Sequence, residues 1–92
     1  MAVTKADIDK AREVARQFGA SRLILFGRAQ ENPEEARDLD LAVDGVPGWT
    51  IWRMAARLEE AISVPLDVVP LEPSTEFTRR IEERGEDLLA AE

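Results

Sequence analysis

The stretch LFGRAQENPEEARDLDLAVDG, residues 25–45, places two aspartates, Asp38 and Asp40, two positions apart in an otherwise apolar segment. Because side chains alternate along an extended strand, the leucines of DLDLAV share one face and both aspartates share the other. Neighbouring carboxylates repel each other, and burying them without a partner is costly. The pair therefore either faces water or binds a positive group.

The segments around this stretch alternate between helical and extended patterns. Helices are predicted over residues 4–19, with Thr4 and Asp7 forming a capping-box-like start, over residues 49–62, and from Ser74 to about Gly85. Strands are predicted over residues 22–26, 38–43 and 65–69. Residues 28–37 are polar, contain Pro33, and suit a loop with room for a helical turn.

This order of elements predicts one α/β (α+β) domain over residues 1–92, with a small mixed β-sheet flanked by helices. The strand–helix–strand segment over residues 38–69 favours a right-handed crossover that places the third strand near the second. Asp67 of the third strand can then join Asp38 and Asp40 on one side of the sheet. Trp49 and Trp52 are expected to help build the core, with a partner interface or nucleobase platform as the alternative for one of them.

The composition excludes several kinds of chemistry. The 92 residues include no Cys and no His, so disulfides, thiolate nucleophiles, histidine bases and Cys or His metal sites are all absent. A metal would therefore be held by oxygen, as magnesium, manganese and calcium are. The formal charge of −7 gives no direct sign of nucleic acid or membrane binding. No apolar run approaches membrane-spanning length, so a cytoplasmic protein is expected.

The three aspartates suit a magnesium site. Asp38 and Asp40 can both reach one or two hard cations, and Asp67 can complete the second position. Two such ions clamp the attacking and leaving oxygens of a phosphoryl transfer. Their charge would also let an acidic chain bind a triphosphate.

The pattern FGR…DLDLAV…LDVV resembles the minimal nucleotidyltransferases of the DNA polymerase β superfamily. In that family an apolar strand ends in Gly-Ser, the next strand carries Asp-x-Asp, and a third Asp follows one helix later. This chain has Gly27, then Asp38-Leu39-Asp40, then Asp67. The likeness extends over nearly the whole chain and implies a polymerase β palm-like fold.

The resemblance implies transfer of a nucleoside monophosphate from a nucleoside triphosphate, most simply ATP, to a hydroxyl group. It assigns Mg²⁺ or Mn²⁺ to Asp38, Asp40 and Asp67, which would be both metal ligands and catalytic residues, and nucleotide binding to Gly27 and Arg28. It also implies a helical HEPN-type partner protein, for which such domains act as antitoxins or modifying enzymes. The chain has no Tyr, so a tyrosine acceptor would lie on another protein.

The chain departs from the family at one position, where Gly-Ser is replaced by Gly27-Arg28. The Arg28 guanidinium either binds phosphate in place of the Ser hydroxyl or pairs with the aspartates at the metal position. Three hypotheses therefore stay open: an active nucleotidyltransferase, a catalytically degenerate antitoxin-like module that binds a partner, and an unrelated acidic α/β protein whose aspartates face water.

Overall fold

The computed structural model describes residues 2–90 and contains four helices and four strands in this part of the chain. Their order is α1 (Lys5–Gln17), β1 (Arg22–Phe26), α2 (Arg28–Glu31), β2 (Leu39–Asp44), α3 (Gly48–Ala61), β3 (Leu66–Pro70), α4 (Glu76–Arg84) and β4 (Glu86–Asp87). None of the helices described here combines the length and the apolar character that a membrane crossing requires.

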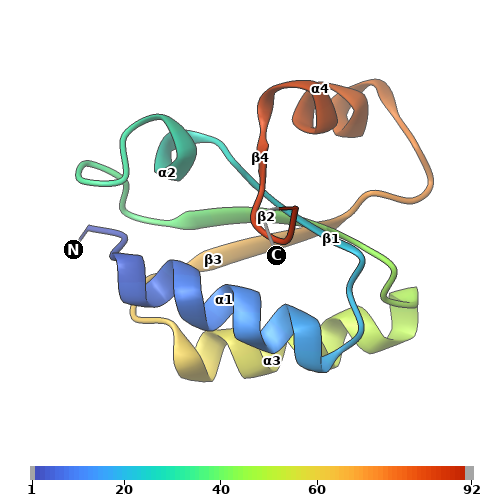
Figure 1. Cartoon of the computed structure of the whole chain (residues 1–92), viewed down its shortest axis with the longest axis horizontal. Coiled ribbons are helices and arrows are strands. Elements are labelled where there is room, and N and C mark those ends of the chain that lie inside the picture. Colours follow the sequence, from blue (N-terminus) through green and yellow to red (C-terminus); the bar gives the residue numbers. More distant parts are fainter. Residues whose placement is uncertain (1, 91–92) are drawn as a thin grey trace.

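The strands form one mixed sheet in the order β3-β2-β1-β4. Strand β1 pairs antiparallel with both β2 and β4, whereas β2 and β3 are parallel and are connected through α3. Helices α1 and α3 cover one face, and α2 and α4 lie on the other side (Figure 1). The mixed α/β architecture that the sequence predicts is therefore confirmed, including a third strand beside the second.

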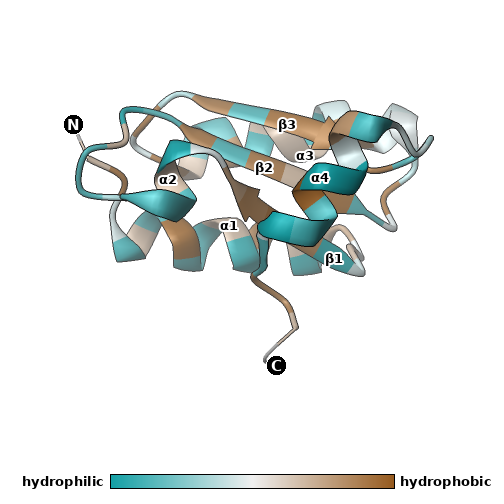
Figure 2. Cartoon of the chain, turned by 90° about the horizontal axis from the view of Figure 1, so that it is seen from above, coloured by the Kyte–Doolittle hydropathy of each residue, from teal (hydrophilic) through white to brown (hydrophobic). Residues whose placement is uncertain are grey.

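The main core lies between the sheet and helices α1 and α3. Strands β1 and β2 bury Leu23, Leu39 and Leu41 completely on this face, against Met54 and Leu58 of α3. These are the positions that the helical and alternating patterns assign to the interior. Viewed from above, α2 and α4 are mostly hydrophilic, while the strands beneath them are largely hydrophobic (Figure 2).

A second, smaller cluster lies on the other face of the sheet, beneath α4. It consists of Ile24, Ala42, Leu71 and Ile81, with Phe26 and Val69 packed against it. This small cluster covers only the middle of the second face, so polar residues lie at both ends of that face. At one end, Arg22 pairs with Asp44 at 2.9 Å and with Glu82 of α4 at 2.7 Å, which ties the helix to the sheet.

Several expectations need correction. Trp49 and Trp52 do not build the core: their exposed fractions are 73% and 80%. They fall outside the apolar stripe of α3, whose inward positions are taken by smaller side chains. The last helix is capped by Thr75 instead of Ser74, because the Thr75 hydroxyl accepts from the Thr78 amide.

The short strand β4 was not predicted, since two residues, Glu86 and Asp87, carry no strand periodicity. Asp87 fixes this strand to its neighbour, because its carboxylate accepts from the Leu23 and Leu89 amides at 3.2 Å and 3.0 Å. Leu88, the next residue, packs into the core. The polar loop between β1 and β2 contains the helical turn α2.

Asp7 connects two distant segments. It completes the predicted capping box with Thr4 at the start of α1, and its carboxylate also accepts from the Ser63 amide and hydroxyl after α3. Burial alone would raise the pKa of Asp7, but the hydrogen bonds from Thr4 and Ser63 outweigh it and hold the pKa below its ordinary value of 3.8. The ionised carboxylate is therefore the form that stabilises the fold.

Replacing Asp7 by Ala should lower the free energy of unfolding at pH 7 by about 2 kcal/mol, because the Ser63 amide loses its acceptor and α1 loses half of its capping box. The exposed Glu13→Ala on the same helix is the matched control and should cost less than about 0.5 kcal/mol. Because the folded-state pKa is lowered, the contribution is fully present above 3.8 and is lost as pH falls through the folded value. Urea unfolding should show a smaller difference in stability between the wild type and Asp7→Ala at pH 3 than at pH 7. A difference that stays constant would contradict this role.

Candidate active site

The candidate site lies at one end of the α4-side face of the sheet. In the strand register Asp40 of β2 stands opposite Phe26 of β1 and opposite Asp67 of β3. Residues paired directly across neighbouring strands point to the same face. Phe26, Asp40 and Asp67 therefore form one row across three strands, and the expected juxtaposition of Asp67 with Asp40 is found in the fold.

Asp38 lies in the bend just before β2, one step outside the ladder. Asp38 and Asp67 are exposed, whereas Asp40 is half-buried. Burial raises the pKa of Asp40 above its ordinary value, and the negative charges of Asp38 and Asp67 raise it further. Asp40 thus interacts electrostatically with both other carboxylates, and ionising it without a cation is costly.

The donor chemistry of this row suits a hard divalent cation, because all three groups are carboxylates. Within residues 2–90, however, no set of three or more acidic side chains is gathered closely enough to hold a metal as it stands. A cation that used all three would require these side chains to turn toward one another. Two of them are exposed and free to do so. Their role as metal ligands and catalytic residues stays a prediction.

Two features require a glycine at position 27: the backbone conformation there and the neighbouring Asp40 side chain. Its φ of 74° and ψ of −154° lie in a region that is essentially restricted to glycine. A Cβ atom at this position would overlap the Asp40 carboxylate oxygen. The glycine therefore lets the backbone between β1 and α2 pass directly beside the central carboxylate, which explains why a Gly of the motif stands here.

Arg28 does not pair with the aspartates. Its ion pair within the described residues is with Glu35 at 3.7 Å, and both side chains are well exposed, at 64% and 68%. Of the two roles considered for Arg28, occupation of the metal position is therefore not what this structure shows. An exposed pair at this distance contributes little to stability, so the guanidinium can exchange partners at small cost.

Two aromatic residues beside the carboxylates were missed by the sequence analysis. Phe26 belongs to the row itself, and Phe77 of α4 meets it edge-on, with ring centroids 6.1 Å apart and planes at 83°. The position of Phe26 was available from strand alternation, since it shares a face with Ile24. No sequence signal paired it with Phe77, because the contact depends on how α4 folds back over β1.

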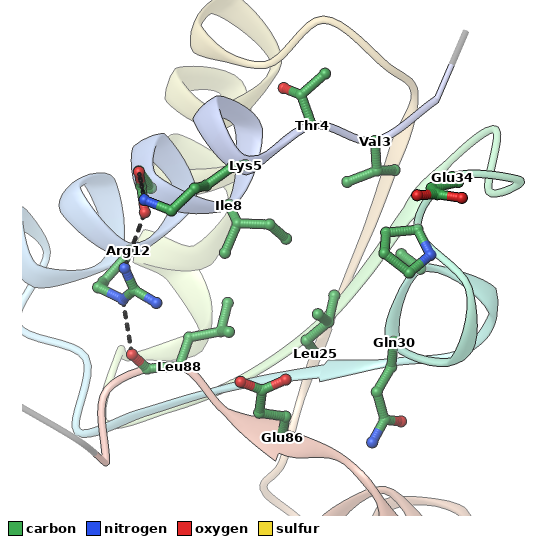
Figure 3. Close-up of a pocket in the computed structure, with 13 residues that line it drawn as sticks. Val3, Thr4, Lys5, Ile8, Arg12, Leu25, Gln30, Glu34, Glu86 and Leu88 are labelled. Carbon is green, nitrogen blue, oxygen red and sulfur yellow. Dashed lines mark hydrogen bonds and ion pairs between the residues drawn. The ribbon is translucent and has the colours of Figure 1, made fainter.

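A separate pocket of about 410 Å³ lies on the α1 side of β1 and contains none of the predicted site residues. Val3, Ile8, Leu25 and Leu88 point toward its interior, and Arg12 bridges the Asp9 carboxylate and the Leu88 carbonyl at its rim (Figure 3). Its lining belongs to the junction between the N-terminal segment, α2 and the chain after β4.

Comparison with known proteins agrees on the class of fold. No protein-family model matches the chain, and no curated protein matches it in sequence. Solved structures do match: the architecture is that of the minimal nucleotidyltransferase fold, represented by structures of toxin–antitoxin pairs. Identities of 18% to 20% show the similarity of fold alone.

Three of these structures illustrate the likeness. A crystal structure of the toxin–antitoxin pair MntA–HpeT, with two aspartates replaced by glutamate, aligns with a TM-score of 0.74 and 18% identity over 88% of this chain and 71% of that one. A toxin–antitoxin structure with AMP-PNP aligns at 0.72 and 20% identity over the same shares. The MntA–HepT structure aligns at 0.69 and 20% identity, over 92% and 71%.

Replacing Gly27 by Ala should destabilise the protein more than the same change at Gly19. Both glycines have a positive φ, 74° and 78°, but a Cβ at Gly19 meets open space, whereas one at Gly27 meets the Asp40 carboxylate. We expect Gly19→Ala to cost about 1 kcal/mol, and Gly27→Ala to cost at least about 1 kcal/mol more. Thermal and urea unfolding measure both stability costs. Equal costs would show that the Asp40 side chain moves away from the new Cβ atom without an energetic penalty.

Proposed function

We propose that the chain is a magnesium-dependent nucleotidyltransferase that transfers a nucleoside monophosphate from a nucleoside triphosphate to a hydroxyl group and releases pyrophosphate. The observation that carries this proposal is the row of carboxylates, in which Asp40 is flanked by two like charges and has a raised pKa. Such an arrangement is unfavourable by itself and becomes favourable when a cation binds. Perturbed carboxylates in an open site are typical of functional sites.

In this proposal Asp38 and Asp40 would hold the metal ions, and Asp67 would bind the second of them and help activate the acceptor hydroxyl. Mg²⁺, or Mn²⁺ in its place, supplies charge for the phosphate oxygens and for the reacting oxygens of the transfer. Asp67 is exposed on β3, the outermost strand of the sheet, so an acceptor can approach it from outside. The raised pKa of Asp40 means that its negative charge is unfavourable at this position. A bound metal ion would neutralise that charge and so stabilise the ionised carboxylate.

The nucleotide's phosphates are assigned to the backbone at Gly27 and to Arg28. Gly27 passes beside Asp40 without a side chain, which leaves room next to the carboxylate. Arg28 is exposed, and its weak pair with Glu35 can give way to a phosphate, which a guanidinium binds bidentately. ATP is the simplest substrate, and one structure of the same fold is of a toxin–antitoxin with its analogue AMP-PNP. We place this reaction in the cytoplasm, where nucleoside triphosphates and magnesium are both plentiful.

Isothermal titration with ATP and manganese tests the proposal. The wild type should bind, and Asp40→Asn should bind at least about tenfold more weakly, because it removes the central anionic ligand. Asp9→Asn, which removes an exposed carboxylate on α1, should bind like the wild type. Affinity should also fall as pH is lowered, since protons compete with the metal for Asp40. Absence of binding by the wild type would refute the catalytic proposal.

A second candidate function is that of an interaction module bound to a helical partner of the HEPN type. Trp49 and Trp52 are strongly exposed on α3, the helix that also carries Arg53 and Arg57, two exposed residues with no ion pair among the described residues. Trp and Arg dominate the energetics of protein interfaces. The structures of similar fold are toxin–antitoxin pairs, which supports a protein partner for this one.

Replacing Trp49 and Trp52 together by Ala should abolish recovery of a specific partner from the native host, because the proposed interface loses its two largest side chains. Lys10→Ala with Glu13→Ala, on the exposed side of α1, serves as the control and should retain the partner. Mass analysis of that partner separates the two candidates: an added nucleoside monophosphate supports the enzyme, and an unmodified partner supports the module. Retention of the same partner by the Trp variant would refute this interface.

A further inference from the structure

Phe77 is an exposed aromatic side chain beside the candidate site. It lies in the first turn of α4 and keeps 55% of its surface exposed, although it contacts Phe26 edge-on. An edge-on contact occupies at most one face of a ring. Phe77 therefore presents free aromatic surface, which is unusual next to a row of carboxylates.

The position of Phe77 is defined relative to Asp40. Phe26 stands directly opposite Asp40 in the antiparallel pair, an arrangement that places the two Cβ atoms about 5 Å apart. The Phe77 ring lies one further step away, with its centroid 6.1 Å from that of Phe26. Phosphates held at Gly27 and Arg28, beside Asp40, would thus leave the ribose and base of the same nucleotide within reach of Phe77.

The capping-box groups beside Phe77 are already hydrogen-bonded to one another. The Thr75 hydroxyl accepts from the Thr78 amide, and the Thr78 hydroxyl donates to the Thr75 carbonyl. Glu76 pairs with Arg80 at 3.0 Å. This turn of α4 therefore offers an exposed ring and no uncommitted side-chain hydroxyl from its capping box, so stacking is the contact with a base that it can supply most directly.

We propose that Phe77 is a stacking platform for the base of the nucleoside triphosphate, and that the site selects purines over pyrimidines by stacking area while distinguishing little between ATP and GTP. This inference rests on the proposed function, because it takes the phosphates to be bound at Gly27, at Arg28 and at the cation beside Asp40. Stacking on an aromatic side chain tolerates any base, since every base has a π-face. The alternative is that Phe77 only shields Phe26 from water, in which case its loss would affect stability alone.

The test compares nucleotides with a ligand that has no base. ATP, GTP, CTP and inorganic tripolyphosphate are titrated, each with manganese, into the wild type, Phe77→Ala, Phe77→Trp, and the control Glu83→Ala from the exposed side of α4. The wild type should bind ATP and GTP about tenfold more tightly than tripolyphosphate, with CTP in between. Phe77→Ala should remove this advantage and leave tripolyphosphate affinity unchanged, and Phe77→Trp should preserve it.

The possible failures are distinguishable. If the wild type binds ATP and tripolyphosphate equally, or if Phe77→Ala keeps the full preference for ATP, the stacking role is wrong while the proposed function stands. If Phe77→Ala weakens all four ligands by the same factor, its role is structural and the inference is overturned. If the wild type binds neither ATP nor tripolyphosphate, the proposed function fails, and this inference fails with it.

Discussion

The close packing of one carboxylate against one glycine organises this end of the molecule. Asp40 lies between two other acidic side chains and directly beside the backbone at Gly27, where even a methyl group would overlap it. Electrostatic and steric effects therefore act on the same carboxylate: burial and the neighbouring charges raise the pKa of Asp40, and the glycine leaves it room. The local sequence between β1 and β2 is constrained by both requirements.

The two faces of the sheet differ in the side chains that they carry. The face under α1 and α3 carries the main core and buries almost only aliphatic side chains. The other face has a small apolar cluster under α4, and the carboxylate row lies beyond it. A buried row of like charges would destabilise a small domain. The carboxylate row lies instead at the edge of the α4 cluster, where exposure to water lowers that cost.

The exposed aromatic residues follow from the same division. Phe77 extends the small cluster toward the carboxylates, whereas Trp49 and Trp52 lie on the outer surface of α3. Neither location adds to the main core, so in a chain this short these side chains are a cost to solubility unless a ligand or partner covers them. A nucleotide base suits the first location and a protein surface the second.

The sequence by itself determined the order of elements from α1 to α4 and the inward stripe of α3, because these follow from local periodicity and capping. It also identified the motif through which the chain resembles the minimal nucleotidyltransferases. Only the tertiary structure decided that Asp67 stands level with Asp40, that Arg28 pairs with Glu35, and that the tryptophans face outward. These features depend on contacts between segments that are distant in sequence: strand register, ion-pair partners and the outward side of a helix. The periodicity of the sequence does not encode such contacts.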